Sequence, residues 1–211
     1  MKIGIIGSGN IGGNFGIHLA KAGHEVMFSS RHPEQLKALV KEAGENASKG
    51  TIEEAAKFGE LIVLSVPFKA IESLSHSIAD EVKNKIIIDT CNPYPGRDGE
   101  VASKVIHDPD MRQSAYTAKH FPGSRLVKAL NTIYFEHLRD YAFRSGEDKI
   151  ALPLAGDDAD AKQIVSQLLQ DIGFEPVDVG TLAESEVMEV DQLLYNKPMN
   201  ARDMKDKLKQ K

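Results

Sequence analysis

Short apolar segments rich in Ile, Val or Leu alternate with amphipathic segments of helical length along most of the chain. The predicted strands cover residues 2–6, 25–29, 46–48, 61–66, 85–89 and 125–129. The predicted helices between them cover residues 11–22, 34–43, 51–58, 69–82 and, less regularly, 113–121. Such alternation is typical of repeated βαβ units. It predicts an α/β fold of the Rossmann type, in which a doubly wound, mostly parallel sheet carries helices on both faces.

The same alternation continues after residue 132 in a shorter segment. The predicted elements there are a helix from Tyr134, a strand over 150–155, a helix over 158–172 that Asp157 opens, and a strand over 175–179. We therefore expect a Rossmann domain over residues 1–132 and a small C-terminal α/β lobe over residues 133–211 that packs on it.

A Gly-x-Gly-x-x-Gly motif follows the first predicted strand directly and opens the first predicted helix. It consists of Gly7, Ser8, Gly9, Asn10, Ile11 and Gly12. Gly7 permits a tight turn, Gly9 lets the backbone approach a pyrophosphate, and Gly12 lets the helix pack closely on the strand. The amino end of the helix then offers N–H groups and a partial positive charge to the phosphates. The alternative is a glycine-rich turn without a ligand, but the order of strand, motif and helix favours dinucleotide binding by these six residues.

The end of the second predicted strand indicates which dinucleotide binds. Units specific for NAD place an acidic residue there, on the ribose 2′-hydroxyl. This sequence has Ser29, Ser30 and Arg31 instead, without a carboxylate. A serine hydroxyl and a guanidinium fork suit the 2′-phosphate of NADP, so NADP(H) is the predicted cofactor. The alternative is that Arg31 and His32 form a solvated turn before the next helix.

Further cofactor contacts are predicted where later strands end, because the carboxyl edge of a parallel sheet borders the ligand crevice. Val66 and Pro67 would form a wall against the cofactor. Asn92 and Asn131 follow the fifth and sixth strands and offer amides to the nicotinamide carboxamide or to a second substrate. Either asparagine could instead cap an element or satisfy a turn. No pair of acid and base groups stands out, so no catalytic side chain is predicted.

Composition and charge argue against several classes of function. The net charge of -5 argues against nucleic-acid binding, which needs a dense basic patch. The sequence has no apolar stretch long enough to span a bilayer and no signal-peptide pattern, so we expect a cytoplasmic protein without a membrane partner. The single cysteine, Cys91, excludes an intramolecular disulfide and is expected to be a buried, unreactive thiol. The histidines are scattered, and no metal site is predicted.

Six motifs together resemble those of the NADPH:coenzyme F420 oxidoreductases, a family of deazaflavin-dependent NADP reductases, and of their uncharacterised bacterial relatives. The motifs are GIIGSGNIGG, the Ser-Ser-Arg after the second strand, LSVPF, Asp-Thr-Cys-Asn-Pro, LVKALNTI and PLAGDD. They occur in the family's order over about three quarters of the chain. The resemblance implies NADP phosphate contacts at Ser30 and Arg31, backbone contacts at residues 8–11, wall contacts at Val66 and Pro67, and a homodimer.

The resemblance also implies a reaction, the transfer of a hydride between NADP(H) and a deazaflavin (coenzyme F420) or a flavin-type acceptor such as FMN or FAD. Relatives include the NADPH domain of membrane ferric reductases, which works with a flavin. Two alternatives remain open. One is NADPH-dependent reduction of a small carbonyl or imine, and the other is a non-catalytic NADP sensor.

Three features depart from the family pattern. Gln35 stands where another basic phosphate ligand is expected, which would weaken the selectivity for NADP. Residues 93–109, which begin PYPGRDGE, form the longest predicted irregular segment. Residues 195–211 end in a lysine-rich run, 205–211, that is predicted to be a solvated tail. Because the last two segments are individual to this chain, we expect them to face the second substrate, a small-molecule redox acceptor.

Overall fold

The computed structural model describes residues 1–108, 111–146 and 149–210, so Pro109 and Lys211, the last residues of two segments discussed above, lie outside the described residues. Its centre is a single eight-stranded sheet with the order β3-β2-β1-β4-β5-β6-β7-β8. The strands are β1 (Lys2–Ile6), β2 (Glu25–Ser29), β3 (Ala47–Gly50), β4 (Leu61–Leu64), β5 (Ile86–Asp89), β6 (Arg125–Ala129), β7 (Ala151–Gly156) and β8 (Glu175–Asp178). All pairings among β1 to β6 are parallel, which confirms the doubly wound Rossmann fold.

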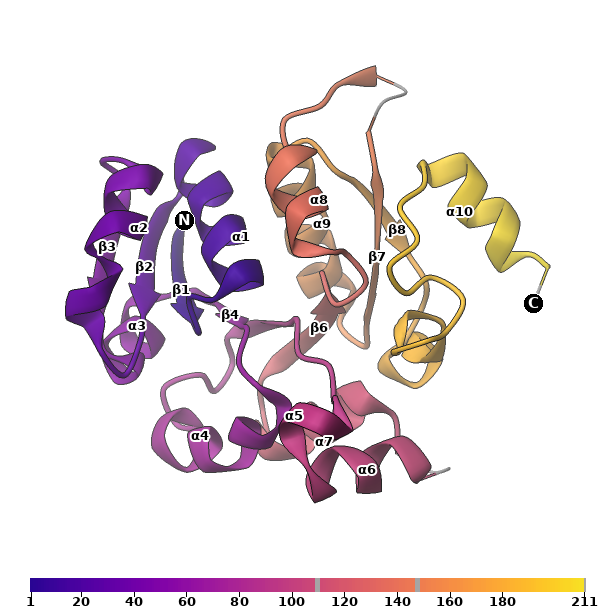
Figure 1. The fold of residues 1–211 in the computed structure, drawn as a ribbon, viewed down its shortest axis with the longest axis horizontal. Helices are drawn as coiled ribbons and strands as arrows, with labels where there is room; N and C mark the ends of the chain where they lie inside the picture. Colours follow the sequence, from indigo (N-terminus) through magenta and orange to yellow (C-terminus); the bar gives the residue numbers. More distant parts are fainter. Residues whose placement is uncertain (109–110, 147–148, 211) are drawn as a thin grey trace.

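Helices cover both faces of this sheet (Figure 1). One hydrophobic cluster joins the strands to α1 (Asn10–Lys21), α2 (Lys37–Ala43), α8 (Phe135–Asp140) and α9 (Ala159–Asp171). A second cluster joins them to α3 (Ile52–Phe58), α4 (Ile71–Ile78) and α6 (Glu100–His107). The strands between the two layers are buried on both sides, which explains their nearly continuous apolar sequences.

The C-terminal strands extend the same sheet. Strand β7 pairs with β6 in the antiparallel sense, and β8 then pairs with β7 in parallel. A third hydrophobic cluster packs β7 and β8 against the C-terminal segment, with Met188 and Met204 buried in it. The division of the chain into domains at residue 132 stays a prediction.

The start of α9 differs from the prediction, because Asp158, not Asp157, caps the helix. The Asp158 carboxylate accepts a hydrogen bond from the N–H of Ala161 at 2.9 Å and pairs with Arg125. The Asp157 carboxylate instead accepts a hydrogen bond from the N–H of Leu182 at 2.9 Å and so holds the segment after β8.

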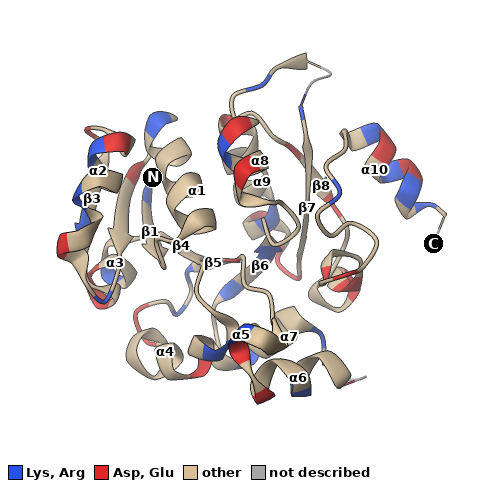
Figure 2. Ribbon diagram, in the orientation of Figure 1, with Lys and Arg blue, Asp and Glu red and all other residues tan. Residues whose placement is uncertain are grey.

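Two segments predicted to be irregular or solvated are helical. Residues 93–109 contain α5 (Pro95–Asp98) and the amphipathic α6, separated by Gly99 with φ of 68°. The lysine-rich run belongs mostly to α10 (Ala201–Leu208), which Asn200 caps and which buries Met204. Figure 2 shows both acidic and basic residues along α10. The remaining narrow apolar face of the helix packs against the sheet. Helix α7 (Gln113–His120) lies close to its predicted bounds.

Two predicted helices begin with a 3-10 turn, and both α-helical parts are shorter than expected. Residues Pro33–Leu36 form such a turn before α2, and Phe68–Ala70 form another before α4. A proline precedes or opens each turn. Because proline has a fixed φ and lacks an N–H, it is suited to the first turn of a helix.

Candidate functional site

The turn between β1 and α1 has the close contacts that its glycines predict. Gly7 has a φ of 96°, and a Cβ there would lie 2.2 Å from the carbonyl oxygen of Ser65. A Cβ on Gly12 would lie 2.2 Å from the carbonyl oxygen of Gly7. A Cβ on Gly9 would meet nothing within 4 Å. Gly7 and Gly12 are therefore required by the turn itself, whereas Gly9 leaves open space above the backbone.

The amino end of α1 faces this open space without a side-chain cap. Gly9 is the N-cap residue, and the first turn contains no acidic side chain. The first turns of α1 are tan in Figure 2, because residues 10–20 include no Lys, Arg, Asp or Glu. The N–H of Gly12 donates to Ser65 Oγ at 3.1 Å. The motif amides that face the open space at the helix end are therefore those of Asn10 and Ile11. This end of α1 therefore favours an anionic ligand.

A cavity of about 720 Å³ extends from this turn to the end of β2. Ser29 is buried, and its hydroxyl donates to the carbonyl of Ile5 at 2.7 Å. The Ser29 carbonyl accepts a hydrogen bond from Ser8 Oγ at 3.0 Å. Ser8 and Ser29 thus tie the two turns together, and the Ser29 hydroxyl is already used within the protein.

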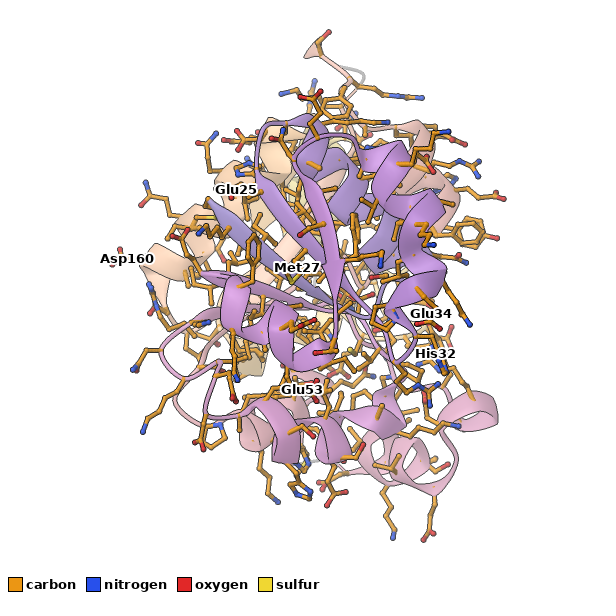
Figure 3. All side chains as sticks on the ribbon, turned by 90° about the vertical axis from the view of Figure 1, so that its left-hand side faces the viewer. Glu25, Met27, His32, Glu34, Glu53 and Asp160 are labelled. Atoms are coloured by element: carbon orange, nitrogen blue, oxygen red, sulfur yellow. The ribbon has the colours of Figure 1, made fainter. Side chains whose placement is uncertain are left out.

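Ser30 and Arg31 line the same cavity beyond Ser29. Ser30 Oγ accepts a hydrogen bond from the N–H of His32 at 3.1 Å, which leaves its proton for a ligand. Arg31 is exposed. Figure 3 shows that His32 and Glu34 lie beside each other after β2, and their side chains are 3.5 Å apart. The turn after β2 is therefore held by its own contacts, with Ser30 and Arg31 at the cavity.

A second cavity, of about 460 Å³, lies over the ends of β5 and β6. It adjoins the first, because both are lined by Gly9, Ser65, Val66 and Pro67. The other lining residues of the second cavity include Asn10, Ile11, Thr90, Cys91, Asn92, Tyr94, Arg97, Leu130, Asn131, Ile133, Tyr134, Phe135, Tyr195 and Asn196. The structure thus brings every predicted site residue except Gly12 to the wall of one of two adjoining cavities, and Gly12 packs beneath the turn.

Asn92 and Asn131 hold each other in the second cavity. Asn92 Nδ2 donates to the carbonyl of Asn131 at 2.7 Å, and Asn131 Nδ2 donates to Asn92 Oδ1 at 3.2 Å and to the carbonyl of Met188 at 2.7 Å. The oxygen Asn131 Oδ1 is buried and has no partner among the described residues. Both side chains thus bind backbone carbonyls of distant segments, and a contact of either with a ligand stays a prediction.

A buried ion pair that sequence reasoning missed supports this wall. Lys128 on β6 donates to Asp89 Oδ2 on β5 at 3.1 Å, and both side chains are almost completely buried. Lys128 Nζ also donates to the carbonyl of Cys91, and Asp89 Oδ1 accepts from the N–H of Cys91 at 2.9 Å. The pair therefore fixes the backbone that carries Asn92. The signal in the sequence was a lysine inside the apolar segment LVKAL.

The thiol of Cys91 is unsuited to nucleophilic chemistry. Cys91 is buried, and its Sγ lies 3.5 Å from the carbonyl of Leu64. Burial, followed by the neighbouring Asp89 carboxylate, raises the pKa of this thiol far above its ordinary value. The prediction of a buried cysteine is confirmed, and its low reactivity stays a prediction, since nucleophilic attack requires the thiolate.

The charged residues that line the two cavities are all basic. They are Arg31, Lys69 and Arg97, and no carboxylate belongs to the lining among the residues that the structure describes. Arg97 is paired with Asp98 at 2.8 Å, and Lys69 Nζ donates to the carbonyl of Arg97 at 2.9 Å. Sequence reasoning missed Ser65 and Lys69. It expected residues 93–109 and 195–211 near the second substrate, and Tyr94, Arg97 and Tyr195 do line the second cavity.

In the described ranges 1–108, 111–146 and 149–210, no group of three or more His, Cys, Asp or Glu side chains could hold a metal ion. No helix there is both long and apolar enough to cross a membrane.

Comparisons with known proteins agree with this geometry. Residues 2–93 match the model of a family described as NADP oxidoreductase, coenzyme F420-dependent. The F420-dependent NADP reductase of Methanothermobacter marburgensis is 29% identical over 208 residues, which cover 93% of this chain and 92% of that protein. The metalloreductase STEAP3 of Rattus norvegicus is 31% identical over 190 residues, or 89% of this chain, but the match spans only 36% of that longer protein.

A solved structure shows the same fold. A hypothetical protein from Sinorhizobium meliloti superposes with a TM-score of 0.81 at 23% sequence identity, and the match covers 95% of both chains. Strand β7 and the elements after it therefore belong to a fold that this solved chain shares over 95% of its length.

Proposed function

We propose that this chain, an NADP-dependent oxidoreductase whose residues 2–93 match the model of the coenzyme F420-dependent NADP oxidoreductases, transfers a hydride between NADP(H) and a deazaflavin (coenzyme F420) or a flavin-type acceptor. The observation that carries this proposal is the pair of adjoining cavities. They meet over Gly9 at the amino end of α1. This arrangement suits a nucleotide that lies across the turn with its two ends in different cavities.

The larger cavity suits the adenosine half of NADP(H). The amides of Asn10 and Ile11 and the backbone at Gly7, Ser8 and Gly9 would meet the pyrophosphate. The Ser30 hydroxyl and the Arg31 guanidinium would bind the 2′-phosphate, and Ser29 would support them through its bond to β1. With no carboxylate in the described lining, nothing there repels a third phosphate group.

The smaller cavity suits the nicotinamide and the acceptor. Val66 and Pro67 form the wall that both cavities share, and Asn92 and Asn131 lie at the ends of the next two strands. The side chains there are aromatic or neutral, apart from Arg97, and Arg97 is neutralised by Asp98. A planar acceptor ring fits such a lining. Direct hydride transfer asks the protein mainly to hold two rings at the correct distance.

Calorimetry with NADPH and NADH tests the nucleotide site. We expect binding of both with a clear preference for NADPH. The purified protein is then mixed with NADPH and offered coenzyme F420, FMN, a ferric chelate and a panel of small carbonyls and imines. Oxidation of NADPH by coenzyme F420 or FMN supports the proposal. Tight binding of NADPH without oxidation by any acceptor would favour a sensor, and oxidation by carbonyls alone would favour the other enzyme class.

We also propose an oligomeric state and a cellular location. The resemblance implies a homodimer, which sedimentation equilibrium tests directly. A cytoplasmic location is expected from the sequence, and fractionation of the host cell tests it.

A further inference from the structure

Two tyrosine hydroxyls meet inside the smaller cavity. Tyr94 Oη and Tyr195 Oη lie 2.5 Å apart, although Tyr94 follows β5 and Tyr195 belongs to the C-terminal segment. Both side chains line the cavity, and both are partly buried. A hydrogen bond between two hydroxyls uses only one of their two protons, so the other remains for a ligand.

The neighbouring groups indicate which proton remains. Asn92 Nδ2 donates to Tyr94 Oη at 3.3 Å, and the Asn92 amide is oriented by its two bonds with Asn131. Burial, followed by the contact with Tyr94, raises the pKa of Tyr195, so that this hydroxyl stays protonated and able to donate. Tyr94 Oη accepts a hydrogen bond from Asn92, and when Tyr195 is the donor of the tyrosine pair, the proton of Tyr94 is left for the cavity.

An arginine side chain also packs on the Tyr94 ring. The Arg97 guanidinium lies over the Tyr94 ring, 4.8 Å from its centroid. Arg97 is held in this place by Asp98 at 2.8 Å and by the carbonyl of Asn92 at 2.8 Å. After the Tyr94 hydroxyl gives up its proton, its oxygen would meet two hydrogen-bond donors, Asn92 and Tyr195, and the Asp98-paired guanidinium of Arg97 would lie beside the ring. These contacts suit a hydroxyl that gives up a proton and regains it from solvent.

We propose that Tyr94 donates a proton to the hydride acceptor and that Tyr195 and Asn92 are positioning residues for its hydroxyl. The inference rests on the proposed function, since a hydride brings two electrons and one proton and leaves the acceptor with a negative charge. The O–H bond of Tyr94 breaks, an N–H or O–H bond forms on the acceptor, and the phenolate is reprotonated by solvent. Each turnover thus consumes one NADPH and one solvent proton. The substrate class that follows is an acceptor whose reacting atom is conjugated to a ring nitrogen or a carbonyl.

The substitution Tyr94→Phe removes the proton and keeps the ring. With NADPH and coenzyme F420 we expect kcat to fall about 100-fold, the lower end of the usual contribution of a general acid. The Kd for NADPH should stay unchanged. We expect kcat of the wild type to decline at high pH, where this proton is lost, and the variant should lack that decline. Tyr195→Phe should lower kcat by about ten-fold, as for loss of one hydrogen bond, and keep that decline.

A matched control is Tyr141→Phe, because Tyr141 lies outside both cavities and packs against His137 and Arg144. It should retain the kcat and the pH profile of the wild type. A wild-type kcat and pH profile in Tyr94→Phe overturns the inference. Failure of the wild type to bind NADPH or to reduce any acceptor overturns the proposed function, and this inference with it.

A second readout needs no turnover. The phenolate absorbance of the free protein is titrated in the wild type, in Tyr94→Phe and in the Tyr94→Phe/Tyr195→Phe double variant, which serves as the baseline. Burial keeps the pKa of Tyr195 raised in Tyr94→Phe, but the contribution of the Tyr94 contact is lost. The Tyr195 phenolate should therefore appear at lower pH than in the wild type. An unchanged transition shows that the two hydroxyls do not interact and overturns the inference.

Discussion

Lys128 and Asp89 are register partners on the neighbouring strands β6 and β5, and their side chains form an ion pair of 3.1 Å in the protein interior. The exposed fraction is 1% for the Lys128 side chain and 0% for that of Asp89. Both charges also bond the backbone of Cys91, one residue before Asn92. The wall of the smaller cavity therefore depends on a pair of charges that water does not reach.

Lys128→Met should be strongly destabilising. Met fills a similar volume but leaves the Asp89 carboxylate buried without its partner, and loss of one member of a buried pair typically costs about 3–5 kcal/mol. Urea unfolding measures the change in the free energy of unfolding. The double variant Lys128→Met/Asp89→Asn should recover much of the loss, because it removes both charges. A single variant as stable as the wild type would contradict this account of the wall.

Arg31→Ala should weaken the binding of NADPH and leave that of NADH nearly unchanged. Arg31 is exposed at the cavity, and the 2′-phosphate that its guanidinium would bind is present in NADPH and absent from NADH. A charged hydrogen bond of this kind contributes about 1–3 kcal/mol to the free energy of binding, which calorimetry resolves. Arg31→Lys keeps the charge but loses the planar fork, so its affinity should be intermediate. Equal losses for the two nucleotides would show that Arg31 does not bind the 2′-phosphate.

The stability of the fold should decrease in mild acid because of His18. His18 is buried between α1 and α8, and its Nε2 lies 3.1 Å from the carbonyl of Leu138. Burial lowers the pKa of His18 below its ordinary value of 6.5, against a smaller opposing effect of the contact with Leu138. The unfolded chain therefore binds a proton that the folded protein resists, and stability is lost as the pH falls below about 6.5.

His18→Gln should reduce this acid-dependent loss. The measurement is the free energy of unfolding in urea at about pH 7 and about pH 5, compared between variant and wild type. The matched control is His107→Gln, because His107 is exposed at the end of α6. It should retain the pH dependence of the wild type. If His18→Gln shows the same dependence as the wild type, His18 is not the group responsible.

The nucleotide-binding half of the fold follows from local sequence signals, and for that reason it was predictable. The strands 2–6, 25–29 and 125–129 have the predicted bounds, since a buried parallel strand is a mostly apolar segment. Helix α10 was missed because its apolar face is narrow and buries Met204 alone. This face is recognisable only from its packing against β7 and β8. Helix α6 was missed because the glycines and prolines of PYPGRDGE are typical of turns.

The candidate site was predictable only where residues adjacent in sequence form it. The glycine motif and Ser30-Arg31 each lie on one turn, so their spacing carries the signal. The contact of Tyr94 with Tyr195 and the pair of Asp89 with Lys128 join residues 101 and 39 positions apart. Such pairs depend on strand order and on the path of the C-terminal segment, which no local pattern specifies.

Gly9→Ala and Gly12→Ala should affect different properties, although the two glycines belong to one motif. Gly12→Ala should lower the stability of the fold, and Gly9→Ala should weaken nucleotide binding. A Cβ on Gly12 would lie 2.2 Å from the backbone oxygen of Gly7, so the helix must move away from the turn. Overpacking of this kind costs about 1–3 kcal/mol of stability. A Cβ on Gly9 has nothing within 4 Å, and the backbone of Gly9 has a φ of -80° that alanine adopts without strain.

Gly9→Ala should therefore fold with the stability of the wild type and yet bind NADPH at least about ten-fold more weakly, because the methyl group occupies the space through which the pyrophosphate approaches the α1 amides. Urea unfolding and calorimetry on both variants separate the two effects. NADH should lose the same factor as NADPH in Gly9→Ala, since the two nucleotides share the pyrophosphate, in contrast to Arg31→Ala. Undiminished binding of both nucleotides by Gly9→Ala would mean that the diphosphate does not lie over this turn.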